Sequence, residues 1–141
     1  MGGHIENCYN YGDIILGDYW ENDSDSASFL CGGIAGYSAG SFNNVYNIGN
    51  ILNHLTNYHY LKVGLCAGQG KPAYEPEGLT NYYSLNRSFV DKSDFNYDVV
   101  IMTEAEMQSD NFLNTLNEGL DTPVWKKDTG INNGYPILSW Q

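Results

Sequence analysis

Residues 42–51, FNNVYNIGNI, repeat a phrase that the chain has already used at residues 5–14, IENCYNYGDI. Five positions are identical at a separation of 37 residues: Asn7/Asn44, Tyr9/Tyr46, Asn10/Asn47, Gly12/Gly49 and Ile14/Ile51. Another step of 37 residues reaches LTNYYSLNRS, residues 79–88, where Asn81 and Tyr83 fall in register. Recurrence at a fixed period is the sequence signature of a repeat architecture.

Small and apolar residues interrupted by glycine precede two copies of the phrase, in FLCGGIAGYSAG (29–40) and LKVGLCAGQG (61–70). The polar segments 16–28 and 53–60 differ in length, which is typical of loops that project from a repeated scaffold. Short strands that recur without helices leave a parallel solenoid, a bladed array or a meander. The solenoid fits best, and we expect an all-β fold with a right-handed parallel β-helix of about three rungs over residues 1–88.

Stacked repeats place equivalent residues about 4.8 Å apart along the stack axis. We therefore expect three rows: Ile5, Phe42 and Leu79 buried, Cys8, Val45 and Tyr82 also buried, and Asn7, Asn44 and Asn81 as a structural ladder. Asparagine suits such a ladder because it tolerates the left-handed backbone conformation and its stacked amides can form hydrogen bonds. By the same reasoning Gly12, Gly49 and Asn86 are expected to form corners with positive φ.

The composition bounds the class of protein. A chain of 141 residues is long enough for one domain, and its 16 glycines and 12 tyrosines favour strands and turns. A net charge of −11 argues against nucleic acid or an anionic membrane as the partner. No apolar run is long enough for a membrane span, so we expect no membrane insertion.

The pattern changes after residue 88, and residues 89–141 are predicted to form a capping segment. A helix near 103–117 opens with Thr103 and Glu106 in capping-box spacing and stops at Gly119. Four residues are expected on its apolar face: Ala105, Phe112, Leu113 and Leu116. A final strand is predicted from Tyr135 to Trp140, after an Asn133-Gly134 turn. We expect this segment to cover an open end of the stack.

The alternation GGIAGYSAGSFNNVYNIGNI, residues 32–51, resembles the GLUG-motif repeats of large bacterial surface proteins. In that family a Gly-Gly-Ile/Leu-Ala/Val-Gly segment precedes an Asn-Cys-Tyr-Asn-x-Gly segment, which IENCYNYGDI matches closely. The tail is similar to the stretch that closes such repeats in Gram-positive bacteria. The resemblance implies an extracellular, cell-surface or secreted setting with a stalk or adhesion-like role. Some relatives adjoin an IgA-type metallopeptidase, but its HExxH signature is absent here.

The first copy of the repeat starts in mid-phrase at Ile5, because GGIAGYSAGS precedes Phe42 and only Gly2-Gly3-His4 precedes Ile5. This predicts that the chain is a piece of a longer protein, with upstream repeats as neighbours. The start, MGGHIEN, lacks the basic-then-apolar pattern of a secretory signal, so we expect any signal to lie in the parent chain.

Residues able to carry chemistry are few, so we expect no enzyme, no metal and no cofactor. His54 and His59 lie in a loop without further ligands nearby in sequence, and Cys66 aligns with Ile34. The acidic segments 21–28 and 91–98 lack a twelve-residue calcium loop; a solvated surface is favoured and calcium stays open. A β-helical polysaccharide-degrading enzyme is a distant alternative, because one arginine and five lysines supply a cationic groove poorly.

Aromatic residues in loops are the best support for binding. The candidate ligand-binding residues are Tyr19, Trp20, Tyr58, His59, Tyr60 and Tyr74. Their rings could stack on a host or cell-wall glycan or anchor a protein partner; alternatively they fold back over strand edges. We therefore expect a non-catalytic structural or adhesion-like repeat module, with a carbohydrate-binding module as the alternative.

Overall fold

The computed structural model of the chain describes residues 3–17, 28–38, 40–54, 60–64, 67–70, 79–85 and 99–141. We call β1 (His4–Asn10), β2 (Ile14–Leu16), β3 (Ser28–Gly32) and β4 (Ala35–Ser38) the first layer. The second layer comprises β5 (Ser41–Asn47), β6 (Ile51–Asn53), β7 (Tyr60–Gly64) and β8 (Ala67–Gly70), and β9 (Leu79–Leu85) is the third. The remaining elements are β10 (Val100–Met102), α1 (Glu104–Met107), α2 (Asp110–Asn117), β11 (Trp125–Lys126), the 3-10 helix η2 (Asn132–Gly134) and β12 (Ile137–Leu138).

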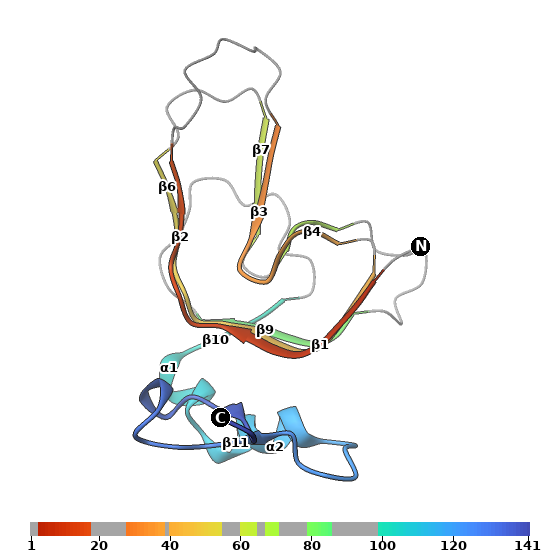
Figure 1. The fold of residues 1–141 in the computed structure, drawn as a ribbon, viewed down its shortest axis with the longest axis vertical. Helices are drawn as coiled ribbons and strands as arrows, with labels where there is room; N and C mark the ends of the chain where they lie inside the picture. The colour runs from red at the N-terminus through yellow and green to blue at the C-terminus, as the bar shows by residue number, and fades with distance from the viewer. Residues whose placement is uncertain are drawn as a thin grey trace.

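Strands of successive layers pair in parallel. One sheet has the order β1-β5-β9-β10, and three two-stranded sheets join β2 to β6, β3 to β7 and β4 to β8. Figure 1 shows the second layer following the path of the first, so that equivalent strands overlie one another. The prediction of an all-β fold with parallel strands is therefore confirmed.

The 37-residue period is the register of the main sheet. Ile5 lies opposite Phe42, which lies opposite Leu79, and Cys8, Val45 and Tyr82 are matched in the same way. The β3–β7 and β4–β8 pairs are offset by 32 residues instead, as in Ala35 with Ala67. The segment between β6 and β7 is thus five residues shorter than its first-layer counterpart, and the segment after β8 restores the period. Loops absorb the change in length while the strands keep their register.

The left-handed asparagines set which side chains face inward. Ile5 and Cys8 pack in one interior cluster with Phe42 and Val45 although they are three positions apart, a spacing that places residues of a regular strand on opposite faces. Asn7 and its equivalent Asn44 have φ of 49°, as predicted, and this conformation interrupts the alternation.

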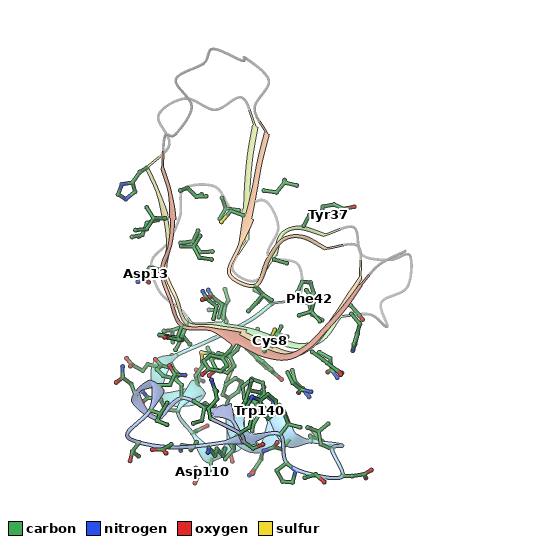
Figure 2. All side chains as sticks on the ribbon, in the orientation of Figure 1. Cys8, Asp13, Tyr37, Phe42, Asp110 and Trp140 are labelled. Carbon is green, nitrogen blue, oxygen red and sulfur yellow. The ribbon has the colours of Figure 1, made fainter. Side chains whose placement is uncertain are left out.

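Two interior clusters fill the space that the layers enclose. The first comprises Phe42 and Val45 with Ile5, Cys8, Ile34, Ala35 and Val99, and the second comprises Cys31, Ile51 and Val63 with Ile14 and Leu16. Phe42 points into this space in Figure 2. Cys8 packs as predicted; Cys8 and Cys31 are free thiols, and burial raises the pKa of both. A Cβ on Gly36 would lie 2.6 Å from the Leu30 carbonyl oxygen, so the chain needs glycine where β4 passes β3.

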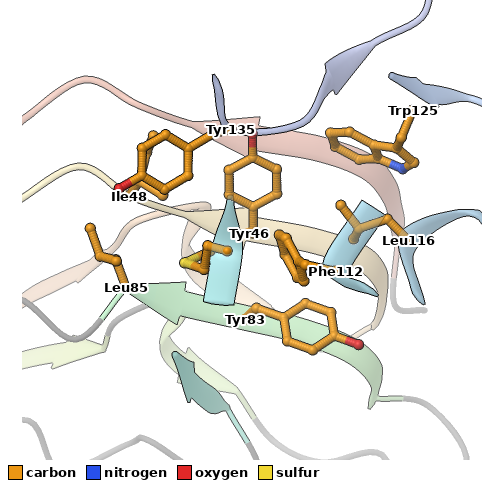
Figure 3. Packing of buried hydrophobic residues seen from close by; sticks show 9 residues of the cluster. Tyr46, Ile48, Tyr83, Leu85, Phe112, Leu116, Trp125 and Tyr135 are labelled. Atoms are coloured by element: carbon orange, nitrogen blue, oxygen red, sulfur yellow. The ribbon is translucent and has the colours of Figure 1, made fainter. Parts of the chain in front are cut away.

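A third and larger cluster joins the main sheet to the C-terminal segment, residues 99–141. It contains Tyr46, Ile48, Tyr83, Leu85, Met107, Phe112, Leu116, Trp125 and Tyr135, with Tyr9 and Met102 packed against it. Tyr9, Tyr46 and Tyr83 are in-register partners, so one tyrosine from each layer faces this segment. Figure 3 shows Tyr46 and Tyr83 of this row.

The C-terminal segment therefore covers the side of the stack, whereas we expected it to cover an open end. Figure 1 shows α1, α2 and β11 alongside the β1-β5-β9 sheet. The physical reason is the outward tyrosine row, an aromatic face that water would otherwise contact. It is β10 that extends the far edge of the sheet, pairing with residues 83–85 of β9.

The predicted helix is interrupted. The capping box of Thr103 and Glu106 is present, but α1 ends after Met107, and Ser109 caps a second helix by accepting from the Phe112 amide at 3.1 Å. Phe112 and Leu116 are buried as predicted, whereas Ala105 is exposed and Met107 is buried instead. This face differs because the break at Ser109 changes the helix phase.

The predicted helix stop is present, and the predicted final strand is shorter than expected. Gly119 lies just beyond α2 with φ of 75°, as expected of a helix stop. The final strand is limited to Ile137–Leu138, which pairs antiparallel with β11. Trp140, at the predicted end of that strand, is exposed.

Candidate functional site

The aromatic residues that the sequence singled out lie mostly outside the described residues. This holds for Tyr19, Trp20, Tyr58, His59 and Tyr74, and for the side chain of Tyr60, whose backbone belongs to β7. The acidic segments 21–28 and 91–98 and Cys66 also lie almost wholly outside the described ranges. Their binding roles stay predictions, and the candidate site has to be built from other residues.

The open edge of the first layer is the first candidate. β1 to β4 pair with β5 to β8 on one side, and in the part of the chain that the structure describes no strand pairs with their other side. We use the term open edge for this side of β1–β4. An unpaired strand edge presents backbone donors and acceptors that fit another strand.

The corner between β1 and β2 shows how one layer recognises the next. The Asn10 amide nitrogen donates to Asn47 Oδ1 at 2.9 Å and to the Gly12 carbonyl at 2.8 Å, while Asn47 donates to Gly49 at 3.0 Å. Asp13 Oδ1 accepts from both the backbone and the side-chain nitrogen of Asn50, each at 2.8 Å. Side-chain bonds with defined donors and acceptors therefore join the first layer to the second at this corner.

This corner row is additional to the Asn7, Asn44 and Asn81 ladder that we predicted, and that ladder stays a prediction. An amide-to-amide bond between layers joins Asn10 and Asn47, whereas Asn7 Oδ1 accepts from the indole nitrogen of Trp125 at 3.2 Å. Asn44 occupies the equivalent position and is buried, and the side chain of Asn81 lies outside the described part of the chain. The repeated Asn10/Asn47 identity was visible in the sequence, but its partners depend on the corner that follows.

The glycines of the corner have a steric role. We predicted positive φ at Gly12 and Gly49, but among the described glycines only Gly119 and Gly134 have it. A Cβ on Gly49 would overlap the carbonyl oxygen of Gly12 in the layer above. Close approach between layers, not a left-handed turn, requires this glycine.

Two exposed aromatic rings form a second candidate. Tyr11 is 71% exposed and Trp140 is 70% exposed. The Tyr9 and Tyr11 ring centroids are 6.3 Å apart, and the Tyr9 hydroxyl donates to the side chain of Gln141, the neighbour of Trp140, at 2.9 Å. Sequence reasoning missed Tyr11, although the repeat offered a signal: its second-layer equivalent is Ile48, which is buried.

A third group of polar side chains spans the first two layers. The His4 ring shares a hydrogen bond through Nδ1 with the Ser41 hydroxyl, and its Nε2 lies 3.1 Å from Glu6 Oε2. Hydroxyl, imidazole and carboxylate in this order resemble a hydrolase relay. The His4 and Glu6 side chains are, however, more than half exposed, so water screens their pairing and the group is a solvated surface contact.

Within the described ranges, no three His, Cys, Asp or Glu side chains are grouped to hold a metal ion. No helix in those ranges is both long and apolar enough to cross a membrane. Comparison of the chain with protein-family models, with curated proteins and with solved structures gave no match. The functional conclusion therefore depends on the geometry of the layers and of their exposed groups.

Proposed function

We propose that this chain is a non-catalytic structural or adhesion-like module of a larger bacterial cell-surface or secreted protein, working outside the cell. Its layers would be about three rungs of a right-handed parallel β-solenoid of the GLUG-repeat type. The observation that carries the proposal is the pairing of residues 37 positions apart across β1, β5 and β9.

The contacts between layers suit a module that transmits mechanical force. Continuous backbone ladders run through the main sheet, and the side-chain bonds of the Asn10–Asp13 corner tie the first layer to the second. The C-terminal segment contacts one tyrosine from each layer and so joins all three. Pulling two layers apart would require many weak bonds to break at the same time, so a module of this kind resists force.

Pulling the chain by its two ends tests this role. Once the C-terminal segment detaches, we expect extension in steps of one 37-residue repeat, which is about 125 Å of extended chain. Single-molecule force spectroscopy measures these steps. Extension without resistance, or without any step near this length, would contradict the proposal.

Carbohydrate binding is the second candidate function. The exposure of Tyr11 beside Tyr9, and of Trp140 next to Gln141, favours it, because planar rings at the surface can stack on sugar rings. The loop aromatics predicted from the sequence could extend such a surface. This reading places the glycan against the junction of β1 with the C-terminal segment.

A glycan array tests this second function with matched variants. Binding that is lost in the Tyr11→Ala, Trp140→Ala double variant but kept in Tyr37→Ala would support it. Tyr37 is the control because it is 54% exposed on β4, on the far side of the layers from Trp140 (Figure 2). Equal signals from the unchanged chain and the double variant would remove the carbohydrate reading.

A further inference from the structure

Three glycines along the first layer, Gly3, Gly12 and Gly17, have no steric reason for being glycine within the described structure, and the first two have glycines as their second-layer equivalents. A Cβ on Gly3 would have nothing within 4 Å, and a Cβ on Gly12 would meet only Asn10 Oδ1 at 3.8 Å. Neither residue has positive φ. Their second-layer equivalents are different: Cβ atoms on Gly40 and Gly49 would overlap the carbonyl oxygens of Gly3 and Gly12.

The side chains of the first layer are also left half covered. Phe42 and Ile51 are each 3% exposed and Val45 is fully buried, whereas their first-layer partners Ile5, Ile14 and Cys8 are only partly buried. The same types of residue thus occupy the same positions in both layers, but only the second layer is covered on both sides.

The polar corner repeats this asymmetry. Asn47 Oδ1 accepts an amide hydrogen from Asn10 of the first layer, while among the described residues Asn10 Oδ1 accepts only from the Gly12 amide of its own layer, at 3.2 Å. Asn50 finds the carboxylate of Asp13 in the layer above. Asn10 therefore repeats the accepting residue Asn47 of the second layer, whereas Asp13 occupies the position of the donor Asn50.

We propose that the open edge of β1–β4 is a docking surface for one further layer with the same repeat pattern, joined ahead of Gly3. Its carbonyl groups lie over Gly3 and Gly12, and its corner asparagine donates to Asn10. This inference rests on the proposed solenoid and adds the partner of its exposed end.

A second copy of this chain stacked head to tail does not fit the open edge. Its opposite end would have to present the third-layer corner, where Ser84 is the partner of Asn47. Ser84 already lies opposite Ile101 of β10, so that edge is paired. A layer in the same polypeptide can instead enter β1 through Gly3 as β4 enters β5 through Gly40, where the Ser41 amide donates to the Gly3 carbonyl at 3.2 Å.

The experiment compares the full chain with an extended chain in which a copy of residues 4–40 is inserted between Gly3 and His4. In the full chain, Gly49→Ala should lower the urea midpoint of unfolding, whereas Gly12→Ala should leave it unchanged or raise it slightly. In the extended chain, Gly12→Ala should lower the midpoint about as much as Gly49→Ala does. Hydrogen exchange should also show newly protected β1 amides.

The outcomes separate the two proposals. If Gly49→Ala does not lower the urea midpoint of the full chain, the stacked layers are overturned, and the proposed function with them. If Gly49→Ala is costly but Gly12→Ala stays harmless in the extended chain, or if that chain misfolds, the docking surface is overturned alone. If the full chain forms a dimer that Gly12→Lys abolishes, the open edge binds a second copy. This result would also overturn the proposed docking of a further layer.

Discussion

Asn7 performs two tasks in this fold. Its backbone has φ of 49°, and its side-chain oxygen accepts from Trp125 Nε1 at 3.2 Å. Asn7→Ala should lower the free energy of unfolding in two ways. Alanine strains the left-handed backbone by about 1–2 kcal/mol, and the lost hydrogen bond costs about 1 kcal/mol. Asn7→Gly should lose mainly the bond. Urea unfolding of both variants measures the difference.

Trp125→Phe provides the matched test of the bond. In this background Asn7→Gly should cost less than in the unchanged chain, because the indole donor is already missing. Asn114→Ala, on the exposed face of α2, is the control for removal of an asparagine and should have little effect. Equal destabilisation by Asn7→Gly and Asn7→Ala would contradict the role given to the left-handed backbone.

Among the elements, α1 and α2 depend on their caps. Thr103 Oγ1 accepts from the Glu106 amide at 3.3 Å, and Glu106 Oε2 accepts from the Thr103 amide at 2.7 Å. Thr103→Ala should lower the free energy of unfolding by about 1 kcal/mol, since it removes the side-chain acceptor of the Glu106 N–H. Thermal unfolding followed by circular dichroism measures the change, and Thr103→Ser, which keeps the hydroxyl, should restore most of it.

The Thr103–Glu106 capping box and the Asp110–Lys127 ion pair give the C-terminal segment a defined pH dependence. Hydrogen bonds from Thr103 lower the pKa of Glu106 below its ordinary value of 4.5, and Lys127 lowers the pKa of Asp110 below 3.8. A lowered pKa in the folded state stabilises above the ordinary value and loses this effect as pH falls through the folded value. Between pH 6 and about pH 3, the free energy of unfolding should therefore fall less in Glu106→Gln than in the unchanged chain. Identical acid profiles would contradict this.

At the scale of the whole molecule, Phe112 connects the C-terminal segment to the layers. Its ring meets the rings of Tyr46 and Tyr83 edge-on, with centroids 5.7 and 5.0 Å apart. Phe112→Ala should cost about 3–5 kcal/mol and should destabilise layers and segment together. Tryptophan fluorescence and far-ultraviolet circular dichroism should therefore give coincident transitions in urea.

Two results bear on this last expectation. Phe112→Leu keeps an apolar side chain in the cluster and should cost clearly less than Phe112→Ala. A fluorescence transition that precedes the loss of strand signal in the unchanged chain would show that the C-terminal segment unfolds separately, and the joint role of the cluster would then be wrong.

Burial of Tyr46 makes it the centre of this junction. It is fully buried, its hydroxyl donates to the Pro136 carbonyl, and the Asn132 amide donates to that hydroxyl at 3.2 Å. Burial raises the pKa of Tyr46 far above its ordinary value, so the phenol stays neutral. The outward face of the second layer is thus tied to the C-terminal segment by both packing and hydrogen bonds.

The sequence by itself determined the 37-residue register, the left-handed asparagines and the Thr103 capping box. Each of these features follows from a local preference of the backbone. Such a preference can be read from the residue type at one position or from its repetition at a fixed period. The parallel pairing of the strands then follows, because layers in register bury equivalent residues together.

Only the tertiary structure decided that the C-terminal segment covers the side of the stack, that Asn10 and Asn47 carry the amide bond, and that Gly49 is needed for close approach. These features depend on side chains that meet across layers or from distant segments, as Asn7 and Trp125 do. The physical reason is that periodicity shows which residues share a face, whereas the choice of what covers that face depends on three-dimensional fit and on the free energy of burying the tyrosine row.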